Sequence, residues 1–102
     1  MKILLTNDDG VHAQGIRELA DTLAQIATVT VVAPTEPRSG ASSQITSRTP
    51  LRLSLMEESA QLSYQLYSCS GTPVDCVKLA LNTLLASELP DLVVSGINHG
   101  RN

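Results

Sequence analysis

Short apolar runs alternate with polar segments in the first part of the chain, and each run predicts one element. Residues 3–6 form an apolar run that stops at polar residues, as a buried strand does where it enters a loop. From Gly15 onward, apolar residues recur at spacings of three and four, which is typical of an amphipathic helix with one face on a sheet. The apolar residues of that predicted face are Ile16, Leu19, Ala20, Leu23 and Ile26.

A second strand is predicted directly after this helix. Residues 29–33 form a β-branched run, and Pro34 closes the run because proline cannot continue a central strand. A strand, a helix and a strand in this order predict a βαβ unit, in which the two strands run parallel. The segment that follows, 34–47, is rich in Pro, Ser, Thr and Gly, and long stretches of this kind are usually functional or disordered.

The middle of the chain predicts an antiparallel hairpin. Residues 51–55 alternate apolar and polar side chains, as a half-exposed strand does. Residues 64–69 are the expected partner strand across an acidic turn at 57–59. We expect this hairpin to be an excursion appended to the parallel sheet.

A second helix and a last strand complete the pattern. Thr72 and Pro73 are the expected N-cap and first residue of the helix. Residues 92–94 predict a further buried strand. The fold class is therefore α/β, with a mostly parallel sheet. The predicted apolar face of the second helix consists of Val74, Val77, Leu81, Leu84 and Leu85.

Composition limits the expected size of the core and the classes of partner that the protein can bind. The 102 residues are 42% hydrophobic with two Tyr and no Trp or Phe, so one aliphatic core is expected, belonging to one domain or part of one. The net charge of −3 predicts no broad positive face, and a nucleic-acid polymer is therefore not an expected partner. The sequence contains no apolar run of about 18 residues and no signal-peptide pattern, which predicts a cytoplasmic protein with no membrane partner.

The two cysteines carry little functional signal. Cys69 and Cys76 are too few for a disulfide framework and do not have the CxxC spacing of a zinc or redox site. We expect both to be plain buried or half-buried thiols, because free cysteine behaves as a small apolar residue.

Unusual polar segments follow the three predicted parallel strands. They are the segments 7–10, 38–40 and 98–102. In open α/β sheets, ligands bind outside the carboxyl ends of the strands, so we expect these segments to converge on one crevice.

Asp8 and Asp9 are the strongest candidates for chemistry. Adjacent carboxylates after an apolar strand repel one another and are costly to bury unless a cation or backbone N–H groups receive them. With Ser39 and Asn98 as neutral donors, the ligand set contains only oxygen, which suits Mg²⁺, Mn²⁺ or Ca²⁺ better than Zn²⁺. The alternative is structural: Asn7 and Asp8 start a turn, and Asp9 caps the following helix.

The other two segments are weaker signals on their own. Gly40 leaves room for a phosphate to approach a backbone N–H, and the 98–102 loop can cradle a phosphate in the same way. Ordinary turns also explain both segments, and a solvated loop histidine explains His99. The chain contains no GxxxxGK[ST], no GxGxxG after a strand and no GxSxG, which argues against a Walker-type NTPase, an NAD-binding fold and nucleophilic acyl chemistry.

Four segments in this order and spacing together resemble the stationary-phase survival protein E (SurE) family of nucleotidases. They are KILLTNDDG at 2–10, VVAPTEPRSGAS at 31–42, SGTPVDCVKLAL at 70–81 and DLVVSGINHGRN at 91–102. The resemblance implies a Rossmann-like, three-layer α/β/α fold. It also implies a divalent-metal-dependent 5'-nucleotidase that acts on nucleoside 5'-monophosphates and 3'-monophosphates, and in some members on short polyphosphate.

The resemblance also assigns roles to individual residues. Carried over position by position, the metal ligands of the family fall on Asp8, Asp9, Ser39 and Asn98. They would hold one Mg²⁺ or Mn²⁺, with Ca²⁺ possible in crystals. Asp8 and Asp9 are the expected catalytic residues. The expected phosphate-binding residues are Ser39, Gly40, Asn98 and Asn102.

Members of that family are longer than this chain, which is expected to be the N-terminal part, 1–102, of such a phosphatase domain. The full-length form is expected to be a homodimer or homotetramer. One alternative is that the fragment is catalytically silent and binds only metal or nucleotide.

Two rival classes place acids around Mg²⁺ in other ways. A receiver-like signalling module also has two acids after its first strand, but it needs a phospho-accepting Asp at the end of a middle strand, where this chain has Ser39 and Asn98. A phosphatase with an Asp nucleophile needs a DxD arrangement, and here the two acids are adjacent. Both rivals are therefore disfavoured.

Overall fold

The computed structural model describes residues 1–37 and 50–98. The elements in chain order are β1 (Lys2–Thr6), α1 (Gln14–Leu23), β2 (Thr28–Pro34), β3 (Leu53–Leu55), the 3₁₀-helix η1 (Glu57–Gln61), β4 (Gln65–Cys69), α2 (Pro73–Leu79), the π-helical turn η2 (Ala80–Leu84) and β5 (Leu92–Ser95).

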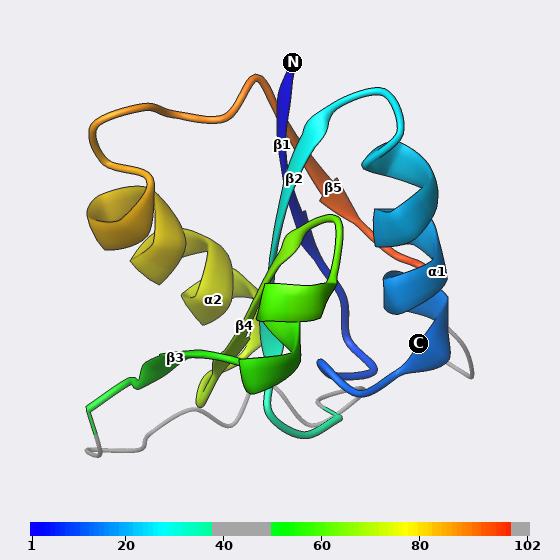
Figure 1. The fold of residues 1–102 in the computed structure, drawn as a ribbon. Coiled ribbons are helices and arrows are strands. Elements are labelled where there is room, and N and C mark those ends of the chain that lie inside the picture. The colour runs from blue at the N-terminus through cyan, green and yellow to red at the C-terminus, as the bar shows by residue number, and fades with distance from the viewer. Residues whose placement is uncertain (38–49, 99–102) are drawn as a thin grey trace.

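The strands form one five-stranded sheet in the order β3-β4-β2-β1-β5. The neighbours β4, β2, β1 and β5 run parallel, and only β3 is antiparallel to its neighbour β4. Helix α1 covers one face of this sheet, and α2 covers the other (Figure 1). The predicted α/β fold, with three layers, a mostly parallel sheet and an antiparallel hairpin, is therefore confirmed.

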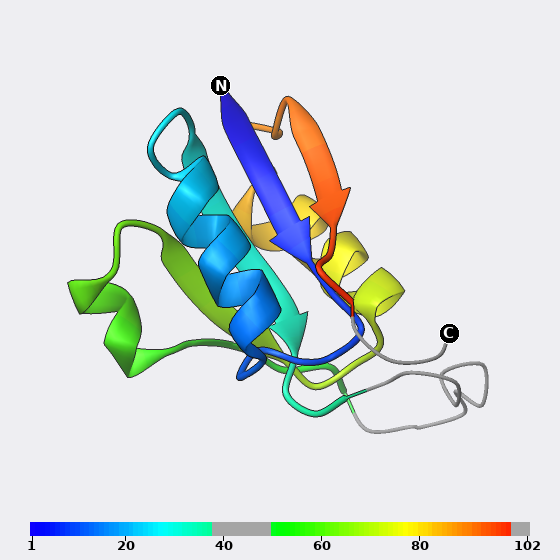
Figure 2. The ribbon, with the colours of Figure 1, turned by 90° about the vertical axis from the view of Figure 1, so that its right-hand side faces the viewer.

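The central strands bury both of their faces, and this explains why they read as continuous apolar runs. Side chains alternate across the sheet, so Ile3 and Leu5 of β1 join the core under α1, whereas Leu4 joins the core under α2. On β2, Val31 and Val32 are divided between the two cores in the same way. Figure 1 shows the sheet edge-on between the two helices, and in Figure 2 α1 lies in front of the sheet, whose strands face the viewer.

The predicted start of the second helix is confirmed in detail. Thr72 is the N-cap of α2, and its hydroxyl accepts a hydrogen bond from the backbone N–H of Asp75 at 3.2 Å. The Asp75 carboxylate accepts in return from the backbone N–H of Thr72 at 3.0 Å, with Pro73 at the first helical position. This capping box satisfies two N–H groups that the helix itself leaves without partners.

In each predicted apolar helix face, one residue is exposed, so the prediction that it is buried is wrong. Ile26 is 79% exposed because α1 ends at Leu23, so the turn that follows no longer keeps helical spacing. Val74 is 62% exposed because it lies in the first turn of α2, on the side away from the sheet, and Cys76 and Ala80 are the buried residues instead. Both cysteines are buried thiols, as predicted.

The strand predictions need two corrections. Strand β2 includes Pro34, which pairs with Cys69 at the last position of the strand. Proline lacks a backbone N–H, and at this last position the strand no longer needs one. The last strand was expected to be buried, but Leu92 and Val93 of β5 are 48% and 47% exposed. The reason is that β5 is an edge strand, paired only with β1 among the described residues. In the parts of the chain that the structure describes, no helix is long and apolar enough to span a membrane.

We predict that Thr72→Ala lowers the free energy of unfolding by about 1 kcal/mol, because it removes the acceptor that caps α2. Urea denaturation followed by circular dichroism measures the change. The control is Ser87→Ala, an exposed serine for which we expect a change within about 0.5 kcal/mol. Equal stability of the two variants would contradict a stabilising role for the capping box.

Candidate functional site

The loop that follows β1 is closed by the side chain of Asn7. Asn7 is fully buried. Its Oδ1 accepts a hydrogen bond from the backbone N–H of Gly10 at 3.0 Å, and its Nδ2 donates to the backbone C=O of Gly10 at 3.0 Å. A single side chain thus satisfies both polar backbone groups of Gly10, and Asp8 and Asp9 are the two residues enclosed by this turn.

The far end of this loop is attached to the end of β2. The backbone N–H of Val11 donates to the C=O of Pro34 at 2.8 Å. Gly10 has a φ of +102°, a value that L side chains rarely adopt, and a Cβ there would lie 3.4 Å from backbone atoms of Pro34, Glu36 and Pro37. Glycine therefore lets the two strand ends approach closely.

The near end of the loop is attached to the segment that follows β5. The backbone N–H of Asp8 donates to Oδ1 of Asn98 at 2.8 Å. One step earlier, the backbone N–H of Gly96 donates to the C=O of Thr6 at 2.9 Å. Two of the three polar segments that we predicted to converge therefore meet at the carboxyl ends of β1 and β5. These hydrogen bonds confirm the prediction for those two segments.

Asp8 and Asp9 are both partly buried at this edge of the sheet. The structural alternative for these residues is half right. Asn7 does start a turn, but α1 has Ala13 at its N-cap with no side-chain hydrogen bond, so Asp9 does not cap that helix. The prediction that Asp9 is a cap is wrong because the helix begins only at Gln14.

The described part of the predicted donor set is Asp8, Asp9 and Asn98, which supply carboxylate and amide oxygens. Ser39, Gly40, His99 and Asn102 lie outside the described residues. Among the described residues, no group of three or more His, Cys, Asp or Glu side chains is placed to hold a metal ion. The predicted set contains only two such side chains, and its other members are a hydroxyl and an amide.

Sequence reasoning did not single out three residues that shape this site. The sequence pattern predicts only that Asn7 starts a turn, that Gly10 belongs to a polar segment and that Thr6 ends a strand. Thr6 is 3% exposed, and within the described ranges its Oγ1 is a buried oxygen with no hydrogen-bond partner. The signal available for Asn7 and Gly10 was their composition, since Asn side chains bond readily to nearby backbone groups and glycine tolerates a positive φ.

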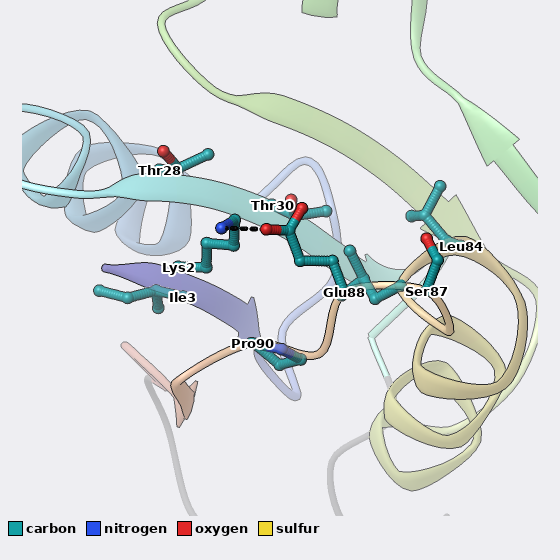
Figure 3. Close-up of a pocket in the computed structure, with 9 residues that line it drawn as sticks. Lys2, Ile3, Thr28, Thr30, Leu84, Ser87, Glu88 and Pro90 are labelled. Carbon is teal, nitrogen blue, oxygen red and sulfur yellow. Dashed lines mark ion pairs between the residues drawn. The ribbon is translucent and has the colours of Figure 1, made fainter.

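A cavity of about 230 Å³ lies at the opposite edge of the sheet, where β1 and β2 begin (Figure 3). Its two charged lining groups, Lys2 and Glu88, form an ion pair across it, and the Glu88 carboxylate raises the pKa of Lys2 above its usual value. Both side chains are well exposed, at 46% and 67%, so the pair is screened by water. None of the predicted site residues lines this cavity, and Asp8 and Asn98 meet at the other edge of the sheet.

Comparisons with known proteins point to a single family. The family model described as "Survival protein SurE" matches residues 3–102. A protein of Porphyromonas gingivalis named 5'-nucleotidase SurE is 56% identical over all 102 residues, which are 39% of its own length. A Vibrio campbellii protein with the same name is 55% identical over the whole chain, which spans 37% of that relative.

A solved structure agrees with these sequence relatives. The crystal structure of the SurE protein from Aquifex aeolicus matches with a TM-score of 0.82 at 38% identity, over 100% of this chain and 39% of the other. The chain thus spans less than two fifths of the length of the relatives it matches.

We predict that Asn98→Ala speeds hydrogen exchange at the Asp8 amide and lowers the free energy of unfolding by about 1 kcal/mol, because a partly buried N–H loses its acceptor. Exchange measured by NMR, together with urea denaturation, tests this. Asn82→Ala is the matched control, since Asn82 is an exposed residue of η2. Unchanged exchange at Asp8 in the Asn98 variant would contradict the contact.

Proposed function

Because this chain belongs to the survival protein SurE family, we propose that it supplies the metal-binding edge of a nucleotidase. The enzyme hydrolyses nucleoside 5'-monophosphates to nucleoside and phosphate and depends on one Mg²⁺ or Mn²⁺. The observation that carries this proposal is the hydrogen bond between Asp8 and Asn98 at 2.8 Å. It joins the two acids after β1 to the amide after β5, at the edge where α/β sheets bind ligands.

The chemistry of the described donors fits a hard divalent cation. Two carboxylates and one amide oxygen are ligands of the kind that Mg²⁺ and Mn²⁺ prefer. Oδ1 of Asn98 accepts one hydrogen bond from Asp8, and an amide oxygen has two lone pairs, so one lone pair remains for a cation. Ser39 is the proposed fourth ligand.

The proposed mechanism asks little covalent chemistry of the protein. When bound, the cation polarises a phosphoryl oxygen and lowers the pKa of a coordinated water. Asp8 is the proposed acceptor for the proton of the attacking water. Asn98, Gly40 and Asn102 are the proposed N–H donors that orient the phosphate in line with that water.

The scope of the reaction is part of the proposal. The family resemblance supports activity on 3'-monophosphates and on short polyphosphate as well. Homodimers or homotetramers are proposed for the longer form. The receiver-like alternative gains no support, because β2, β4 and β5 end at Pro34, Cys69 and Ser95 rather than at an aspartate.

We predict that Asp8→Asn and Asp9→Asn each lower metal-dependent release of phosphate from AMP by at least about a hundredfold in a full-length version, because each removes an anionic ligand of the cation. Phosphate release is measured with Mn²⁺ and with EDTA. Asp21→Asn is the control, since Asp21 is an exposed acid on α1. Full activity in either site variant would contradict the metal assignment.

We predict that phosphate release from a panel of nucleoside monophosphates requires Mg²⁺ or Mn²⁺ and stops in EDTA. The panel is run with the 102-residue chain beside a full-length version. Activity only in the longer protein supports this chain as the metal-binding part of the enzyme, and binding without turnover supports the silent-fragment alternative. Equal activity in EDTA would contradict metal dependence.

A further inference from the structure

We infer that Asn7 is a positioning residue: its side chain sets the conformation of the Asp8–Asp9 loop before the cation binds. This inference rests on the proposed metal site. It concerns a residue that is not itself a proposed ligand: the Asn7 side chain is fully buried, and its two polar groups face the backbone of Gly10.

The contacts of Asn7 make a closed turn. Its Oδ1 and Nδ2 each lie 3.0 Å from a backbone atom of Gly10, and the side chain is fully buried. Water therefore does not compete for these bonds, and a buried amide that loses its partners is costly. Asp8 and Asp9 lie inside this turn, so their backbone conformation is restrained from both sides.

The loop is also held at its exit. The backbone N–H of Val11 bonds to the C=O of Pro34 at 2.8 Å, and Nε of Arg17 donates to the C=O of Val11 at 3.0 Å. These bonds fix the position of Val11 against β2 and α1. Between Thr6 and Val11, the bonds of Asn7 to Gly10 and of Asp8 to Asn98 are restraints on the residues that carry the acids.

Electrostatics explains why such a restraint is useful. Two adjacent carboxylates repel each other, and in the absence of a cation this repulsion favours a loop that opens toward water. A turn closed from the buried side opposes that opening. The cation then meets acids that are already in place, and less ordering is left to be done on binding.

The test is a titration of Mn²⁺ into the 102-residue chain, followed by isothermal calorimetry or by the spin resonance of free Mn²⁺. We expect Asn7→Ala to weaken binding by about tenfold, because the loop that carries the acids must then be ordered at the expense of binding free energy. Val29→Ala is the matched control. Val29 is 2% exposed at the start of β2, so this variant also loses stability in the core, far from the loop.

The outcomes separate this inference from the proposed function. Tight binding by the wild type, weak binding by Asn7→Ala and near wild-type binding by Val29→Ala support it. Equal binding by the wild type and Asn7→Ala overturns the positioning role and leaves the metal site standing. No binding by the wild type overturns both the metal site and the inference.

A second measurement needs no variant, which matters if Asn7→Ala does not fold. In the metal-free wild type, the Gly10 amide should exchange with solvent at least about tenfold more slowly than an unstructured amide, because Asn7 Oδ1 holds it. Exchange at the unstructured rate without metal would mean that the turn is not formed in advance, and would overturn the inference.

Discussion

The parallel pairing of β1 with β2 on one side and β5 on the other is the constraint on which the candidate site depends. In this register Leu5 lies opposite both Val31 and Val94, so all three strands bring their carboxyl ends to one edge. Asp8 and Asn98 are 90 positions apart in the chain and meet there. A slip of β5 by one residue would turn its side chains to the other face. The geometry of the site is therefore a property of the whole sheet.

The two-sided core explains why the polar residues begin where they do. Side chains on both faces of β1 are buried, and Thr6, at its last position, shows the difficulty, because within the described ranges its buried Oγ1 has no hydrogen-bond partner. Asn7 is the first residue after the strand, and it remains fully buried because Gly10 satisfies both of its polar groups. The candidate site therefore begins with Asn7, a polar residue that belongs to the core. Asp8 and Asp9 follow where the chain leaves the core.

Much of the fold could be predicted from the sequence, because apolar runs, helical spacing and caps are local signals. The meeting of Asp8 with Asn98 could also be predicted from the sequence, since neighbouring parallel strands bring their carboxyl ends to one edge of the sheet. The exposure of Ile26, Val74 and β5 did not, because periodicity does not reveal where a helix stops or what covers a strand. The burial of Asn7 depends on close approach of the loop to β2, and a turn signal alone does not contain that information.

The two acids and the residues that hold their loop have opposite effects on the free energy of folding. The bonds made by Asn7, Val11 and Asn98 keep the loop closed, and closing it keeps the like charges of Asp8 and Asp9 close together. Like charges held in a folded loop disfavour the compact state, and these two acids belong to a chain with a net charge of −3. A ligand that binds only the folded state stabilises it, and the proposed divalent cation would also reduce the repulsion between the acids. Under the proposed function, metal affinity and fold stability would therefore be coupled through this loop and through the residues that hold the acids in place.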